Sequence, residues 1–235
     1  MVKAITYIKR KPGMSVEAFQ EYWRTRHADV VVKMPGIRGY VQSHARPSGY
    51  AKGELPYDGI AEMWFDDTNA MKGLRTDPAY AAVQADEANF IDRSTTGLLI
   101  TEEHVIKGGA IPAGAAKHVE FVTRKPGLGV DEFQRYWRTV HGPIAATIPT
   151  LSRYVQSHTR RPAYEGGRRP PAYDGVAITW FDDTAAMRAS AASAEYARTR
   201  ADEPNFLDTD RLPVIIAREH VIVPAPTDVR VSGDR

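Results

Sequence analysis

The sequence contains no cysteine, which excludes disulfide bonds, thiolate nucleophiles and cysteine-ligated zinc or iron-sulfur sites. It also lacks a glycine-rich phosphate-binding loop, a Gly-x-Ser-x-Gly nucleophile elbow and a His-Glu-x-x-His metal-binding helix. These absences argue against a nucleotide cofactor and against the active sites that carry those motifs. We therefore predict no cofactor and no bound metal.

Long apolar runs are absent too, and no stretch approaches the roughly 18 apolar residues of a membrane-spanning helix. The first residues, Met-Val-Lys-Ala-Ile-Thr-Tyr-Ile-Lys-Arg-Lys, carry charge where a signal peptide has an apolar run. The 31 basic residues nearly balance the 29 acidic ones, and neither sign forms a long run. We expect a cytoplasmic protein that binds neither nucleic acid nor a membrane.

The sequence does contain an internal repeat. Residues 19–27 read Phe-Gln-Glu-Tyr-Trp-Arg-Thr-Arg-His, and residues 133–141 read Phe-Gln-Arg-Tyr-Trp-Arg-Thr-Val-His, an offset of 114. The offset becomes 116 after residue 158, so that Trp-Phe-Asp-Asp-Thr at 64–68 recurs at 180–184. An internal repeat of this length predicts two copies of one domain, each of roughly 110 residues.

The order of elements can be predicted within one copy. Alternating apolar residues predict strands over residues 2–9, 38–44, 58–65 and 97–106. Apolar residues at helical spacing predict a first helix that begins near Ser15 and ends before Pro35-Gly36. A second helical region begins at Asp66-Asp67-Thr68, which we interpret as capping residues, and is broken at Asp77-Pro78. The order is β-α-β-β-α-β, the ferredoxin-like unit.

This pattern divides the chain into a first repeat over 1–107, a linker over 108–116, a second repeat over 117–223 and a disordered tail over 224–235. One such unit leaves a face of its sheet uncovered, and the second copy can cover it. We expect an α+β pseudo-dimer in which the two sheets pack face to face with the helices outside. Whether two such chains pair into a homodimer of pseudo-dimers is left open.

The residues also resemble a known family. A strand followed by Lys-Pro-Gly, a helix with Phe-x-x-Tyr-Trp-x-x-x-His and a strand reading Tyr-Val-Gln-Ser-His are similar to the EthD domain, in the dimeric α/β-barrel superfamily. The resemblance covers both copies and implies an intramolecular barrel that encloses a hydrophobic cavity. It also implies relatives among polyketide cyclases, anthrone decarboxylases, muconolactone isomerases and cofactor-independent monooxygenases. Some members accompany oxidative degradation pathways without a settled catalytic role.

The leading catalytic candidates are His27 and its repeat equivalent His141. Phe19, Trp23 and His27 are spaced at i, i+4 and i+8, so the imidazole extends an aromatic stripe on the buried helix face. Histidine suits proton transfer because its unperturbed pKa is near neutrality. The resemblance adds weight, since this histidine recurs in EthD-like domains. The alternative is a buried structural histidine that hydrogen-bonds a nearby group.

A second constellation alternates along the strand at 38–44, where Tyr40, Gln42 and His44 share one face. Tyr154, Gln156 and His158 repeat it. If the helices cover the opposite face, these side chains point into the barrel, where tyrosine and histidine act as acid and base or orient a substrate. The alternative is a polar cavity lining without chemistry.

Other candidates bind the substrate. The tryptophans Trp23, Trp137, Trp64 and Trp180 are predicted as core or cavity wall. His118 and Glu120 replace Ala4 and Thr6 of the first copy, whereas Glu62 is replaced by Ile178 in the second. A carboxylate in an apolar barrel has a raised pKa and can act as a general base, and the alternative for each is surface exposure.

Asp86-Glu87 and Asp202-Glu203 are interpreted as solvated or capping charges near a helix end. Taken together, the patterns favour an acid-base enzyme of lyase, cyclase or isomerase type without a redox cofactor. Its partner is a small hydrophobic oxygenated molecule of aromatic or polyketide-like character. The alternative function is a non-catalytic binding or accessory protein for a hydrophobic metabolite.

Overall fold

The computed structural model describes residues 1–165 and 169–226, and residues 227–235 of the predicted tail lie outside the described part. The chain divides into two compact units. Unit 1 comprises residues 1–100 together with the strand end that begins at Ala217, and unit 2 comprises residues 101–216. The division falls within strands, because the last strand of each repeat begins in one unit and ends in the other.

Unit 1 is built on the first repeat. Its complete strands are β1 (Val2–Ile8), β2 (Gly39–Ala45) and β3 (Gly59–Phe65), joined by parts of β4 (Gly97–Lys107) and β8 (Val214–Val223). Its helical segments are α1 (Val16–Tyr22), η1 (Trp23–His27), α2 (Ala28–Val31), η2 (Pro47–Lys52), α3 (Thr68–Gly73), η3 (Leu74–Thr76) and α4 (Pro78–Glu87). Every predicted strand of this repeat ends within one residue of its observed bounds.

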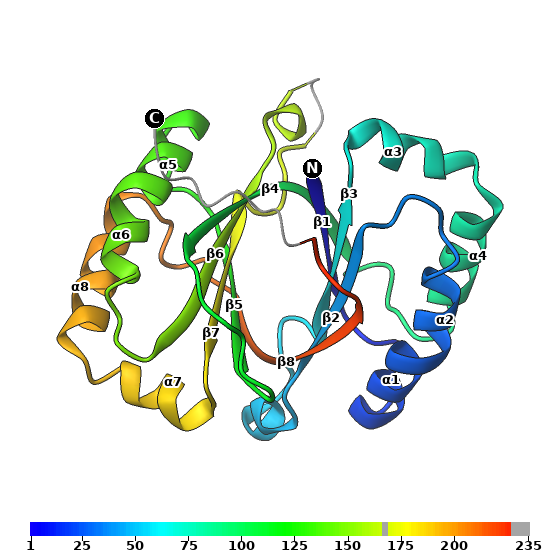
Figure 1. The fold of residues 1–235 in the computed structure, drawn as a ribbon, viewed down its shortest axis with the longest axis horizontal. Helices are drawn as coiled ribbons and strands as arrows, with labels where there is room; N and C mark the ends of the chain where they lie inside the picture. Colours follow the sequence, from blue (N-terminus) through cyan, green and yellow to red (C-terminus); the bar gives the residue numbers. More distant parts are fainter. Residues whose placement is uncertain (166–168, 227–235) are drawn as a thin grey trace. The chain divides into compact units, whose positions relative to one another are not determined.

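Unit 2 repeats the same order. Its complete strands are β5 (Ala116–Val122), β6 (Leu151–Thr159) and β7 (Gly175–Phe181). Its helical segments are α5 (Val130–Tyr136), η4 (Trp137–His141), α6 (Gly142–Ala145), η5 (Arg161–Ala163), α7 (Thr184–Ser190), α8 (Ala194–Asp202) and η6 (Glu203–Asn205). Figure 1 shows α5 to α8 on one side of β5, β6 and β7, and α1 to α4 on one side of β1, β2 and β3.

The eight strands follow one closed hydrogen-bonded order, β1-β3-β2-β8-β5-β7-β6-β4. The pairing is antiparallel between β3 and each of β1 and β2, between β2 and β8, between β4 and β6, and between β7 and each of β5 and β6. The end of β4 pairs with β6, and the end of β8 pairs with β2. The predicted fold class is therefore confirmed: two ferredoxin-like β-α-β-β-α-β repeats form an intramolecular α/β barrel.

Capping residues begin the helices as the sequence predicts. The Asp67 carboxylate accepts hydrogen bonds from the main-chain N–H groups of Asn69 and Ala70 at the start of α3. Asp77 caps α4. The first residue of this helix is Pro78, and proline suits that position because it has no N–H to leave unsatisfied. The interpretation of the Asp66-Asp67-Thr68 segment as a cap is thus confirmed for Asp67, and the predicted break at Asp77-Pro78 is the point where α4 begins.

The helix that carries the first aromatic stripe contains a π-helical turn in each repeat, over Trp23–His27 in η1 and Trp137–His141 in η4. Such widened turns are rare and often occur at functional sites. The buried Trp23 ring packs closely against β3: a Cβ atom added to Gly59 would lie 2.6 Å from its ring. A Cβ atom added to Gly175 would likewise lie 2.6 Å from the Trp137 ring. Glycine at these two positions lets the tryptophan rest directly on the strand backbone.

Candidate active site

Each unit contains a cavity on the face of its sheet that the helices cover. The cavity of unit 1 has a volume of about 330 Å³. Its wall includes Ala4 and Thr6 of β1, Tyr40 of β2, and Trp23 and His27 of the π-helical turn. Apolar side chains dominate the rest of the wall, so the cavity suits a small hydrophobic molecule.

The cavity of unit 2 occupies the equivalent place and has a volume of about 310 Å³. Trp137, His141 and Tyr154 line it as their counterparts line the first cavity. His118 and Glu120, which the sequence singled out as differences between the copies, also belong to its wall.

His27 belongs to a histidine-aspartate pair at the edge of the first cavity. Its Nδ1 lies 2.7 Å from Oδ2 of Asp86, on α4. The Asp86 carboxylate also accepts hydrogen bonds from the Tyr22 hydroxyl at 2.6 Å and from the Asn89 amide at 3.2 Å. Because an ionised carboxylate only accepts, Nδ1 of His27 carries the proton, and Nε2 of the neutral ring keeps its lone pair.

The electrostatics of this pair favour a neutral imidazole. Burial lowers the pKa of His27, and the Asp86 carboxylate offsets that effect only in part. Although burial alone raises the pKa of Asp86, the hydrogen bonds from Tyr22, His27 and Asn89 hold it below its ordinary value. Within the described parts of the chain, no other group hydrogen-bonds the His27 ring. Nε2 is therefore available to a molecule in the cavity.

The second repeat builds the same pair from equivalent residues. Nδ1 of His141 lies 2.9 Å from Oδ2 of Asp202, and Asp202 accepts hydrogen bonds from Tyr136 and Asn205. Burial lowers the pKa of His141, whereas Asp202 raises it less strongly. Two independent copies of one arrangement show that the fold itself positions this pair.

A hydrogen-bonded network connects the π-helical turn to β2. Nε1 of Trp23 donates to the Tyr40 hydroxyl at 3.3 Å, and the Gln42 amide donates to the same oxygen at 2.8 Å. Gln42 also donates to the main-chain carbonyl of Trp23 and accepts from Nε2 of His44 at 2.9 Å. Trp137, Tyr154, Gln156 and His158 repeat the network.

The phenolic proton of Tyr40 remains unused by this network. The oxygen accepts two hydrogen bonds, and no acceptor for its own proton is found among residues 1–165 and 169–226. Burial raises the pKa of Tyr40, so the hydroxyl stays protonated near neutrality. The Tyr154 hydroxyl likewise accepts two hydrogen bonds, and burial raises its pKa. Each tyrosine thus lines its cavity with a phenolic proton that it can donate.

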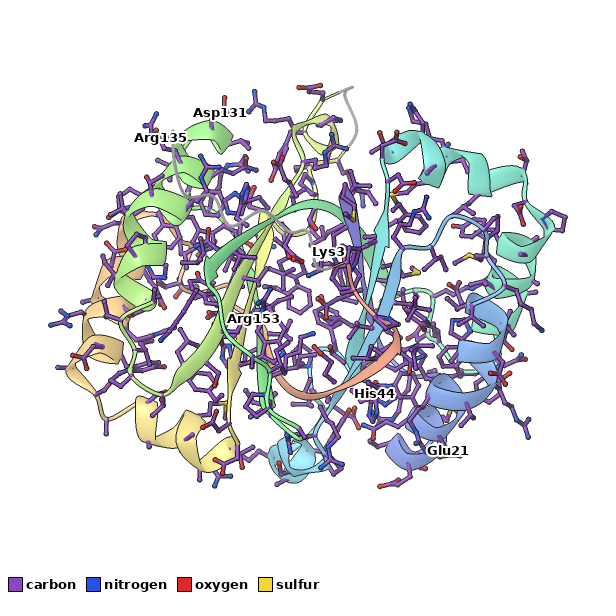
Figure 2. All side chains as sticks on the ribbon, viewed as in Figure 1. Lys3, Glu21, His44, Asp131, Arg135 and Arg153 are labelled. Carbon is purple, nitrogen blue, oxygen red and sulfur yellow. The ribbon has the colours of Figure 1, made fainter. Side chains whose placement is uncertain are left out.

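The condition under which Tyr40, Gln42 and His44 would point into the barrel, that the helices cover the opposite face of β2, is not met. Gln42 contacts Trp23 of the first helix, and the His44 ring stacks on the Trp23 ring at a centroid distance of 4.4 Å. The helices therefore cover this face. Figure 2 shows His44 on the helix side of β2.

His44 and His158 lie behind the tryptophan rings and outside the cavity walls, as do Gln42 and Gln156. Burial lowers the pKa of His44 to about 3 and that of His158 well below its ordinary value. Both rings are thus neutral, and each donates through Nε2 to the neighbouring glutamine. Their contacts orient the tryptophan and glutamine that hold the tyrosine.

The remaining predicted residues lie on the other face of the sheets. Glu62 is buried and forms an ion pair with Lys3 at 2.7 Å, and it accepts a hydrogen bond from Ser43. The Lys3 ammonium lies 4.9 Å from the centre of the Trp64 ring. Lys117 lies over Trp180 in the same way. Figure 2 shows Lys3 on the side of β1 away from the helices of unit 1, so these side chains do not line that unit's cavity.

The sequence interpretation missed the role of three acidic residues at the end of the second helical region. Asp86 and Asp202 contact the histidines rather than solvent. Glu203 is buried, lines the second cavity and lies 2.8 Å from Nη1 of Arg200, which is 3.6 Å from Glu120. Burial and the neighbouring Glu120 raise the pKa of Glu203 to about 7. The only sequence signal for the two aspartates was that the same position is an aspartate in each copy, Asp86 in the first and Asp202 in the second.

The sequence matches one known domain family in both repeats. The EthD domain model matches residues 11–94 and 125–210, which together make up most of the chain. The chain belongs to the EthD domain family. Among curated proteins, none matches its sequence.

Solved structures share the fold at low sequence identity. An anthrone oxidase-like protein is 11% identical, with a TM-score of 0.62 over 97% of this chain and 96% of that one. A mutant chlorite dismutase from Candidatus Nitrospira defluvii is 7% identical, with a TM-score of 0.53 over 94% and 92%. At such identities these similarities establish the fold and not the reaction.

Two further observations concern the helices and the charged residues of the described structure. None of the helices there has the length and apolar character of a membrane span. The same residues include no group of three or more histidine, aspartate or glutamate side chains arranged to hold a metal ion.

Proposed function

We propose that this protein is an acid-base enzyme of lyase, cyclase or isomerase type, which works without a redox cofactor on a small hydrophobic oxygenated substrate. One observation carries the proposal. In each unit a neutral histidine, protonated on Nδ1 by its contact with aspartate, lines the same apolar cavity as a tyrosine whose phenolic proton has no acceptor. A base and a hydrogen-bond donor thus face one bound molecule.

The roles follow from these protonation states. The Tyr40 hydroxyl donates a hydrogen bond to a substrate carbonyl oxygen, and Nε2 of His27 removes a proton from the adjacent carbon. The C–H electron pair becomes the enolate, whose negative oxygen the tyrosine stabilises. The Asp86 carboxylate stabilises the imidazolium that forms, and the imidazolium then returns the proton at its final position. Tyr154, His141 and Asp202 act in the same way in unit 2.

The cavity walls support a substrate of aromatic or polyketide-like character. Their apolar surface binds a ring system, while the tyrosine and histidine select for an oxygen function beside an acidic C–H bond. Similarity to an anthrone oxidase-like protein is consistent with an aromatic ketone. Anthrone is therefore a suitable probe, because enolisation exchanges the protons of its methylene group with solvent.

We expect the protein to accelerate hydrogen-deuterium exchange at the anthrone methylene group in deuterated buffer, as followed by proton NMR. In the Tyr40→Phe/Tyr154→Phe double variant, we expect the catalysed rate to fall about 100-fold, the usual cost of removing one donor to a developing oxyanion. Because phenylalanine retains the ring, thermal unfolding of the variant serves as the control for folding. Exchange at an unchanged rate in the folded variant would contradict the assignment of the tyrosines.

A second candidate function, non-catalytic binding of a hydrophobic metabolite, is favoured by the predominantly apolar walls of both cavities. The same experiment separates the two functions. A binding protein would be stabilised by anthrone in a thermal unfolding assay yet leave its exchange rate equal to that of buffer. An enzyme shows both stabilisation and faster exchange.

A further inference from the structure

The two cavities differ at several equivalent positions of their walls. At four lining positions an apolar side chain of unit 1 is replaced by a polar one in unit 2, according to the repeat offsets of 114 and 116. These pairs are Ala4 and His118, Met63 and Thr179, Leu74 and Ser190, and Val83 and Thr199. At a fifth position, Thr6 is replaced by Glu120. At these positions the second cavity therefore has polar side chains where the first has smaller or apolar ones, whereas Arg75 of the first cavity is replaced by Ala191 in the second.

Three of the polar residues form a row across neighbouring strands. His118 of β5 pairs in register with Thr179 of β7, and Thr179 pairs with Tyr154 of β6. Paired residues on adjacent strands place their side chains side by side on one face. Unit 1 has Ala4, Met63 and Tyr40 in this row, so only the tyrosine is shared.

The added polar groups in this row are open to a ligand. His118 lines the cavity and has no hydrogen-bond partner in the described structure, and the same is true of the Thr179 hydroxyl. By contrast, the hydroxyls of Ser190 and Thr199 donate to carbonyls of their own helices. The unused hydrogen-bonding capacity is therefore concentrated beside Tyr154, on β5 and β7.

Glu120 lies two residues after His118 on β5, so its side chain is on the same face of the strand. There it is close to Arg200 of α8. Nη1 of Arg200 lies 3.6 Å from Glu120 and 2.8 Å from Glu203. The residue equivalent to Arg200 in unit 1 is Gln84, which is not part of the cavity wall. Glu87, the equivalent of Glu203, also lines the first cavity, but Thr6 and Gln84 replace Glu120 and Arg200, so the cluster of Glu120, Arg200 and Glu203 belongs to unit 2.

We propose that the unit 2 cavity binds a ligand with two oxygen functions, and that His118, Thr179 and Glu120 recognise the second one as a neutral hydroxyl group. Unit 1, which has Ala4, Met63 and Thr6 at the three equivalent positions, binds ligands with a single oxygen function. This inference rests on the proposed function, because it assumes that Tyr154 and Tyr40 each bind the first oxygen. It assigns different substrate preferences to the two repeats.

A hydroxyl group fits the cluster better than an ammonium group does. A hydroxyl both donates and accepts, so that it donates to the Glu120 carboxylate and accepts from a neighbouring N–H or O–H. A cation is already present, since Arg200 lies against both carboxylates. Glu203, whose pKa is about 7, is partly protonated near neutrality, which further reduces the negative charge that a cationic ligand would need.

The two cavities can be observed separately, because Trp23 lines one and Trp137 the other. Protein labelled with 5-fluorotryptophan gives one fluorine NMR signal for each tryptophan, and Trp23→Phe and Trp137→Phe variants assign these two. Titrations with 1-naphthol and with dihydroxynaphthalene then give the affinity gained from a second hydroxyl at each site. We expect that gain to be at least tenfold larger at Trp137 than at Trp23.

The His118→Ala/Glu120→Thr double variant introduces the residues of unit 1 into unit 2. We expect it to reduce the gain at Trp137 to the value at Trp23, while the gain at Trp23, an internal control in the same molecule, stays unchanged. Thr179→Met is the second test, should the double variant fail to fold, and we expect it to reduce the gain at Trp137 as well.

Three outcomes would overturn the inference. The first is an equal gain from the second hydroxyl at both tryptophans, and the second is an unchanged gain at Trp137 in the folded variants. The third is tighter binding of naphthylmethylamine than of dihydroxynaphthalene at Trp137, which would identify a cation site. Each leaves the proposed function intact if 1-naphthol binds, whereas the absence of naphthol binding at both tryptophans would overturn the two proposals together.

Discussion

Replacing both His27 and His141 with alanine is expected to lower the catalysed rate of anthrone exchange by about 100-fold to 10,000-fold, the usual contribution of a positioned general base. In the proposed function each imidazole is the base of its unit, because it lines the cavity and its Nδ1 contact with aspartate leaves the Nε2 lone pair unused. Alanine removes that lone pair and leaves the tyrosine without a base. The loss should appear in the rate and not in the affinity for anthrone.

The single variants provide the control for this experiment. Because each unit contains a complete set of the three residues, His27→Ala and His141→Ala should each remove the contribution of one unit and leave that of the other. The rates lost in the two single variants should then add up to the rate lost in the double variant. A folded double variant that retains the full exchange rate would show that the histidines are structural, which is the alternative that the sequence left open.

The second large effect concerns stability in mild acid. Burial lowers the pKa of His44 to about 3 and that of His158 well below its ordinary value, and burial also lowers the pKa values of the other five histidines. A histidine whose folded pKa is depressed binds its proton more readily in the unfolded chain. Its contribution to stability is present above pH 6.5 and is lost as the pH falls toward the folded value.

We therefore expect the free energy of unfolding to fall steeply between pH 7 and pH 5. The slope that each strongly shifted histidine contributes is small at pH 7 and approaches about 1.4 kcal/mol per pH unit as the pH falls below 6.5. Glu203 opposes the trend, because its raised pKa adds stability as the pH falls below 7. Since the lowered histidines outnumber it, the net slope remains destabilising toward acid. Chemical denaturation at several pH values measures this slope.

A matched variant tests the origin of the slope. His44→Phe/His158→Phe retains an aromatic ring stacked on each tryptophan but removes the two titrating groups. We expect the variant to be less stable at pH 7, because the glutamine carbonyl loses its donor, but to have a flatter dependence on pH. An identical slope in the variant and the parent protein would mean that these histidines are not responsible.

Local patterns predicted much of the fold. The helix caps and the strand bounds depend on residues that are near each other in sequence, so propensity and periodicity suffice to place them, and the repeat is found by comparing the sequence with itself. The same reasoning identified the histidines and tyrosines that line the cavities. Local patterns did not determine which face of the sheet the helices cover. Alternation along a strand shows that Tyr40 and His44 share a face, but not what packs against it.

The partners of the candidate residues could not be predicted, because they are distant in sequence. Asp86 lies 59 residues from His27, and near a helix end it looks like an ordinary solvated charge. Glu62 seemed suited to be a base in an apolar cavity, yet the neighbouring strand places Lys3 against it in an ion pair. Such contacts depend on strand register and helix packing, which a single sequence does not specify.

The central claim is that His27 and His141 are neutral bases whose lone pair faces the cavity. Nitrogen-15 NMR of histidine-labelled protein at pH 7 tests it most directly, with each ring assigned from its alanine variant. We expect both rings to be neutral tautomers with the proton on Nδ1 and an unprotonated Nε2. A proton on Nε2, or an imidazolium at pH 7, would contradict the account.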